Sequence, residues 1–75
     1  MKIGIIAAMP EELVYLTQNL DKPKEVQFLG NTYYTGSVGN TEVVLVQSGI
    51  GKVMSAMSVA ILADYFQVEA IINTG

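Results

Sequence analysis

Residues 43–51 read VVLVQSGIG, an apolar run typical of a buried strand that ends in small and flexible residues. Two other stretches have the same form: residues 3–9, IGIIAAM, and residues 70–75, AIINTG. In open α/β sheets, ligands bind in the crevice outside the carboxyl ends of the strands. If the three strands are parallel, their ends therefore line one cleft, and we expect the functional residues there.

The chain after the first of these stretches predicts a helix. A strand at residues 2–8 is followed by Pro10, which stands at the favoured first position of a helix. Leu13, Leu16 and Leu20 then give that helix one apolar stripe over about three turns. We expect DKPK, residues 21–24, to end it.

The middle of the chain predicts an antiparallel meander of three strands: residues 25–29, 32–38 and 41–48. Gly30-Asn31 and Gly39-Asn40 separate them, and two-residue connections with glycine first are typical of type II′ or I′ hairpins. Residues 52–66 form a helical pattern of small and apolar residues, and a last strand is expected at 68–72. The predicted order is β-α-β-β-β-α-β, an α/β fold with a mixed central sheet flanked by helices.

The composition indicates that residues 1–75 are the N-terminal portion of a larger single domain. Hydrophobic residues are 51% of the chain and charged residues 15%, whereas soluble domains have about 25% charged residues. A chain this short buries only about 60% of its unfolded surface, which is too little for so apolar a sequence. We therefore expect further layers of the same domain to cover the strands.

Charge and residue types exclude several functions. The net charge is −3, with four lysines and no arginine, so the basic patch that nucleic acids require is absent. Without cysteine or histidine, we expect no metal site and no thiolate chemistry. The N-terminus has no signal-peptide pattern, and the longest apolar stretch, near 53–63, is too short for a bilayer. We expect a cytoplasmic protein with no membrane partner.

The glycine-containing segment SGIGK, residues 48–52, does not fit a nucleotide-phosphate loop. A Walker A motif would require glycine at Val46 and serine or threonine at Val53. A dinucleotide fingerprint would require glycine or alanine at Met54. The two glycines instead allow a close approach of the backbone to a ligand or to a neighbouring element.

Glu12 is the candidate catalytic residue, because it lies just past the first strand at about the third helical position. There its carboxylate could act as a general base in the cleft, or it could simply stabilise the positive end of the helix dipole. Met9 and Ile50 both follow strand ends. They could form an apolar wall for a ligand, or they could belong to the core.

Three motifs together closely resemble the bacterial 5′-methylthioadenosine/S-adenosylhomocysteine nucleosidases: MKIGIIAAMPEE at residues 1–12, SGIGKV at 48–53 and IINTG at 71–75. The resemblance covers the whole chain and corresponds to about the first third of such an enzyme. It implies a purine nucleoside phosphorylase-like α/β fold and cleavage of the N-glycosidic bond between adenine and a 5′-thioribose. No cofactor is implied.

The resemblance also assigns roles to individual residues. It implies that Glu12 activates the attacking water, that Met9 and Ile50 line the ribose and 5′-alkylthio region, and that Ala8 lies nearby. A carboxylate suits this chemistry, since it both deprotonates water and faces the positive charge of an oxocarbenium-like sugar. The family further implies a homodimer whose partner subunit helps to close the 5′ end of the site.

The chain departs from the family pattern at two positions, and part of the site is expected elsewhere. Ala7 and Pro10 stand where many members have a glycine and an acid, which a strand and a helix start tolerate. The family's ribose-binding glutamate, the aspartate that protonates adenine, and the aromatic purine clamp would all lie beyond Gly75. The chain therefore carries half of a site.

Two alternative functions remain open. The first is a nucleoside phosphorylase of the same fold, although phosphorylases of that group hold phosphate with arginines and this segment has none. The second is a non-catalytic nucleoside-binding α/β domain, which is indicated if Glu12 points away from the cleft.

Overall fold

The computed structural model describes residues 1–28, 30–47 and 59–74. Its elements are β1 (Lys2–Ala7), α1 (Pro10–Gln18), β2 (Asp21–Phe28), β3 (Asn31–Val38), β4 (Thr41–Gln47) and β5 (Ala70–Asn73). Residues 59–64 are also helical. The order β-α-β-β-β-α-β predicted from the sequence is thus confirmed.

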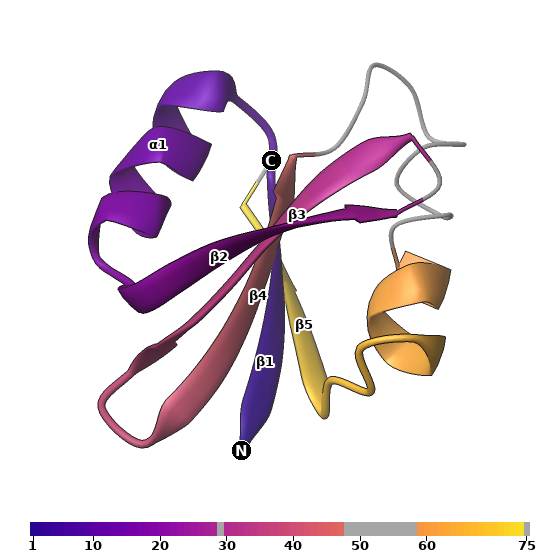
Figure 1. Cartoon of the computed structure of the whole chain (residues 1–75). Coiled ribbons are helices and arrows are strands. Elements are labelled where there is room, and N and C mark those ends of the chain that lie inside the picture. The colour runs from indigo at the N-terminus through magenta and orange to yellow at the C-terminus, as the bar shows by residue number, and fades with distance from the viewer. Residues whose placement is uncertain (29, 48–58, 75) are drawn as a thin grey trace.

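The five strands form one mixed sheet in the order β2-β3-β4-β1-β5 (Figure 1). β1 is parallel to both β4 and β5, whereas β2, β3 and β4 form the expected antiparallel meander. The parallel strands β1, β4 and β5 consequently end at one edge of the sheet, which we call the carboxyl edge. This arrangement is the one that a shared cleft requires.

β4 lies in the middle of the sheet and is covered on both faces (Figure 1), as its continuous apolar run predicts. On one face Val43 and Leu45 form a cluster with Leu20, against which Leu13 and Leu16 pack. We call this the α1 cluster, because α1 supplies the covering layer. Its buried side chains are aliphatic and come from β4 and from Leu20, while the α1 residues that pack on them are only partly buried. Full burial of such a side chain is worth about 1.5–3 kcal/mol.

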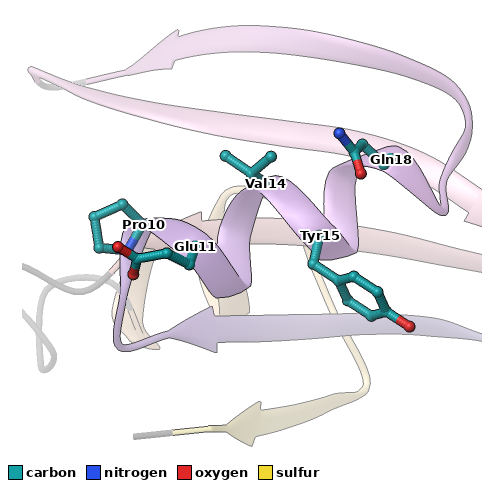
Figure 2. Close-up of a pocket in the computed structure, with 5 residues that line it drawn as sticks. All are labelled: Pro10, Glu11, Val14, Tyr15 and Gln18. Atoms are coloured by element: carbon teal, nitrogen blue, oxygen red, sulfur yellow. The ribbon is translucent and has the colours of Figure 1, made fainter.

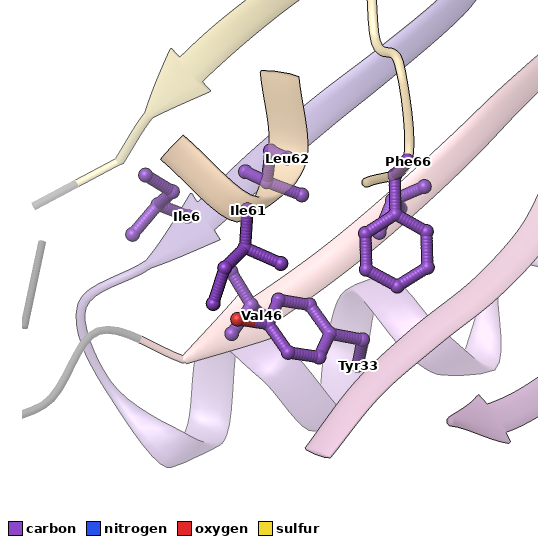
Figure 3. Close-up of a cluster of buried hydrophobic side chains, with 7 residues drawn as sticks. Ile6, Tyr33, Val46, Ile61, Leu62 and Phe66 are labelled. Atoms are coloured by element: carbon purple, nitrogen blue, oxygen red, sulfur yellow. The ribbon is translucent and has the colours of Figure 1, made fainter. Parts of the chain in front are cut away.

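The opposite face carries a second cluster, shown in Figure 3, which we call the aromatic cluster: Ile6, Tyr33, Val44, Val46, Ile61, Leu62 and Phe66. The 59–64 helix and the turn after it provide this layer. The rings of Tyr33 and Phe66 lie 5.0 Å apart between their centroids. Gly4 of β1 permits the close packing, since a Cβ at this position would lie 3.0 Å from Leu62 Cδ1.

The prediction that residues 21–24 end the first helix is wrong, because the helix ends earlier and these residues begin a strand. α1 ends at Gln18, and Leu20 reaches the α1 cluster from beyond the helix. β2 begins at Asp21 and contains Pro23, with Lys22 and Pro23 both opposite Gly36 in a bulge. Proline is tolerated here because β2 is an edge strand and a bulge leaves residues unpaired.

The connections also differ slightly from the prediction. Phe28 pairs with Asn31, so Gly30 is the last residue of the first connection rather than the first. The second connection is as predicted, since Val38 pairs with Thr41 and Gly39 has a φ of 61°.

The last two predicted elements are shifted or only partly described. The final strand is Ala70–Asn73 rather than 68–72. The predicted helix at 52–66 is helical over 59–64, and its residues 52–58 lie outside the described residues.

Candidate functional site

The carboxyl edge brings together the strand ends that the sequence motifs share. Ile6 pairs with Val46 of β4 and with Asn73 of β5, so the three strands end level with one another. Ala7, next along β1, pairs with Gln47, the last residue of β4. The motif that follows β4, including the candidate residue Ile50, lies outside the described residues.

Only Ala8 and Met9 connect β1 to α1. Met9 caps the helix with an extended backbone and no side-chain hydrogen bond, and its carbonyl oxygen accepts a bond of 3.2 Å from the Leu13 N–H. Its side chain is 55% exposed and Ala8 is half-buried. Met9 therefore does not belong to either cluster of the described residues, and its apolar side chain is available to a ligand at the carboxyl edge.

Glu12 is the third residue of α1, as predicted, and it differs from its neighbour Glu11. Glu12 is half-buried and lies one turn before Leu16, on the side of the helix that packs against the sheet. Glu11 is exposed and lines a hollow on the outer side of α1 with Val14 and Tyr15 (Figure 2). Of the two carboxylates, Glu12 is therefore the one nearer to the sheet.

The Glu12 carboxylate has no hydrogen-bond or ion-pair partner within residues 1–28, 30–47 and 59–74. Its position in the first turn places it at the positive end of the helix dipole. A carboxylate held in this way, and not engaged by any side chain of the described residues, can accept a hydrogen bond from a ligand or a water molecule.

Thr74 is not among the residues predicted from the sequence to form the site, yet its side chain is part of this edge. Its N–H and its Oγ1 both donate to the Ile6 carbonyl oxygen, at 3.0 Å and 3.3 Å respectively. The second bond joins residues 68 positions apart, so no local spacing in the sequence indicates it. It ties the end of β5 to the end of β1.

Neither a metal site nor a membrane helix is found in the described part of the chain. No group of three or more acidic side chains there could hold a metal ion. No helix there has the length and apolar character needed to cross a bilayer. The candidate site thus consists of a helix start, a carboxylate and apolar side chains at the ends of parallel strands.

The fold and this site define a protein class. Residues 2–75 match the family described as the phosphorylase superfamily, and the chain belongs to it. Among its members, the chain is similar to 5′-methylthioadenosine/S-adenosylhomocysteine nucleosidases. It is 52% identical over 75 residues to the one from Maridesulfovibrio salexigens and 47% identical to the one from Colwellia psychrerythraea.

Solved structures of such nucleosidases superpose closely on the chain. The Streptococcus pneumoniae enzyme, solved with the transition-state inhibitor MT-ImmA, has a TM-score of 0.94 and 75% identity over the whole chain. The Streptococcus pyogenes enzyme, solved with 5-methylthiotubericidin, has a TM-score of 0.94 and 64% identity. The chain covers 33% and 32% of these two structures, and 32% of the M. salexigens relative. It therefore spans about a third of the length of its relatives.

Proposed function

We propose that the full-length protein hydrolyses the N-glycosidic bond of 5′-methylthioadenosine and S-adenosylhomocysteine, with residues 1–75 as the N-terminal portion of a single nucleosidase domain. The observation that carries this proposal is the half-buried Glu12 on the sheet side of α1, at the carboxyl edge, in a chain 75% identical to a solved nucleosidase. The other two-thirds of the relatives' length would supply the rest of the site.

In the proposed reaction, water attacks C1′ of the ribose as the bond from C1′ to the adenine nitrogen breaks. Glu12 takes the proton from the water, and the adenine leaves with the electron pair of the broken bond and receives a proton from an acid elsewhere in the protein. The products are adenine and a 5′-thioribose. A general base of this kind contributes typically 10²- to 10⁴-fold to the rate.

The substrate's thioether arm fits the apolar residues of the same edge. Met9 exposes 55% of its side chain, and Ala8 beside it is small. We place the ribose and the 5′-alkylthio group against Ala8, Met9 and Ile50. Thioether and methyl groups are poorly hydrated, so their contact with apolar side chains is favourable.

Hydrolysis is favoured over phosphorolysis by the charges of this region. The chain has no arginine and a net charge of −3, and two acidic residues occupy the first turn of α1 at the carboxyl edge. A phosphate bound there would face carboxylates and find no bidentate partner among residues 1–75. Water is therefore the proposed nucleophile.

We also propose that the enzyme is a cytoplasmic homodimer that acts in methionine salvage. The proposed products fit such a salvage pathway, since the released thioribose retains the methylthio sulfur and the adenine can be reused. The homodimer follows from the resemblance to these nucleosidases, and the exposed Val14 and Tyr15 on the outer side of α1 are apolar side chains that a second subunit or the rest of the domain would cover.

Glu12→Gln in the full-length protein tests the proposed reaction. The substitution keeps the shape of the side chain but removes the proton acceptor, so kcat should fall by about 10²-fold or more while a nucleoside analogue still binds. Glu11→Gln is the matched control, because it removes the same charge from the same helix turn on the outer side. It should leave kcat near that of the wild type.

The assay also separates the two reaction types. Adenine release is measured with and without phosphate, and the sugar product is identified. Near-full turnover by Glu12→Gln would show that this residue only stabilises the helix dipole. A requirement for phosphate, with formation of a 5-thioribose 1-phosphate, would replace the hydrolase by a phosphorylase.

A further inference from the structure

Thr74 adds a side-chain hydrogen bond to the backbone ladder between β5 and β1. Its N–H bond to the Ile6 carbonyl oxygen, at 3.0 Å, continues the parallel pairing of Asn73 with Ile6. Its Oγ1 donates to the same oxygen at 3.3 Å. The carbonyl oxygen of Ile6 thus accepts two hydrogen bonds from one residue, and only the first of them is required by the sheet.

Ile6 lies directly before the segment that carries the candidate site. The fully buried Ala7 ends β1, and only Ala8 and Met9 separate it from the first residue of α1. A connection of two residues has little freedom to absorb a displacement. A shift of the end of β1 is therefore transmitted to Met9 and to the first helical turn, where Glu12 lies.

We propose that Thr74 is a positioning residue, whose hydroxyl fixes the end of β1 and thereby the position of Glu12. This inference rests on the proposed function of Glu12 as a base. Thr74 acts through Ile6 and does not need to touch the substrate. Proton transfer requires heavy atoms within about 2.6–3.2 Å, so a small displacement of the base lowers the rate.

A pair of substitutions isolates the hydroxyl group. Thr74→Val is nearly isosteric and removes only the Oγ1 bond, since the N–H bond to Ile6 remains. Thr74→Ser keeps the hydroxyl and loses a methyl group. Thr17→Val is the matched control, because the Thr17 hydroxyl also donates to a backbone carbonyl, that of Leu13 at 2.7 Å, in the second half of α1 away from the carboxyl edge.

In the full-length protein, Thr74→Val should lower kcat about 2- to 10-fold with little change in KM, as expected for the loss of one hydrogen bond that positions the base indirectly. Thr74→Ser should restore kcat, and Thr17→Val should leave it unchanged. An unchanged kcat in Thr74→Val, or a failure of Thr74→Ser to restore it, would overturn the proposal.

Hydrogen exchange of the amides of residues 6–9 provides a second readout that does not depend on activity. Thr74→Val should raise their exchange rates, whereas Thr74→Ser and Thr17→Val should not. If the wild type releases no adenine, the proposed function fails, and the exchange rates alone decide whether Thr74 fixes β1. A loss of kcat in Thr74→Val without faster exchange would refute positioning.

Discussion

The two faces of the sheet are built from different side chains. The buried residues of the α1 cluster are all aliphatic, with Tyr34 at its border, and the cluster lies under the helix that carries Glu12. The aromatic cluster contains Tyr33 and Phe66, and Tyr65 stacks on Phe28 at its border with ring centroids 4.1 Å apart. Only the first cluster supports α1 directly, so packing on that face couples stability most closely to the site. Packing on the other face reaches the site only through Ile6 at the end of β1.

A matched pair of core substitutions, one on each face, tests this difference and should have the largest effect on stability. Leu45 and Leu62 are both fully buried, one in each cluster. Leucine-to-alanine changes in cores cost about 2–5 kcal/mol, so Leu45→Ala and Leu62→Ala should destabilise the full-length protein by similar amounts. Leu45→Ala should also lower kcat more than Leu62→Ala does, because α1 shifts toward the cavity that the substitution leaves. Denaturant unfolding and adenine release measure both quantities, and equal kcat values would show that the faces do not differ.

Much of this architecture could be predicted from the sequence because it depends on local signals. Pro10 starts α1, which sets Glu12 at the third helical position. The continuous apolar run of β4 indicated a strand covered on both faces, and Gly39 marked a hairpin. Each of these features follows from residue types a few positions apart.

The features that could not be predicted from the sequence depend on residues that are distant in the chain. Pro23 suggested a break, but Gly36 lies opposite the bulge and leaves space for Leu20. The hydroxyl bond of Thr74 to Ile6 likewise requires β5 to be placed beside β1. Such contacts exist only once the sheet order is known, so local patterns could not indicate them.

Alanine substitutions at two glycines, one on each face of the sheet, should have an intermediate effect on stability. A Cβ at Gly36, on the α1 side, would lie 2.9 Å from Leu20 Cβ and 3.1 Å from the Asp21 carbonyl oxygen. These atoms are close to or part of the backbone and cannot move aside, so Gly36→Ala should cost about 1–3 kcal/mol. A Cβ at Gly4 would meet the flexible end of Leu62.

Gly4→Ala should therefore cost less than Gly36→Ala. The lower conformational entropy of unfolded alanine, worth about 0.4–1 kcal/mol, offsets part of the strain in both variants, so the difference between them reports the contacts alone. Thermal unfolding of both variants in the full-length protein measures the difference. A greater loss for Gly4→Ala would mean that Leu62 is held more rigidly than Leu20.

The smallest effect is expected from the hydroxyl of Tyr33 in the aromatic cluster. The side chain is fully buried, and its hydroxyl forms no hydrogen bond within the described part of the chain, although the Asn31 side chain lies near enough to stabilise its ionised form. An unpaired buried hydroxyl is costly, so Tyr33→Phe should leave the stability at neutral pH unchanged or raise it by up to about 1 kcal/mol. Removal of this unpaired hydroxyl should thus not lower the stability, whereas removal of a paired polar group, such as the Thr74 hydroxyl, should lower it.

The pH dependence of the same variant gives a sharper test. Burial raises the pKa of Tyr33 above its ordinary value of 10.0, and the nearby Asn31 side chain offsets this only in part. Above pH 10.0 the unfolded chain loses the phenolic proton while the folded protein keeps it, so the wild type loses stability as the pH rises. Tyr33→Phe lacks this loss, and its advantage over the wild type should grow from pH 9 to about pH 11. Tyr15→Phe, at a position that is 67% exposed, is the control. Chemical denaturation across this range measures the free energy of unfolding of both proteins. A constant difference between wild type and Tyr33→Phe would show that the Tyr33 hydroxyl does not titrate differently in the folded and unfolded states.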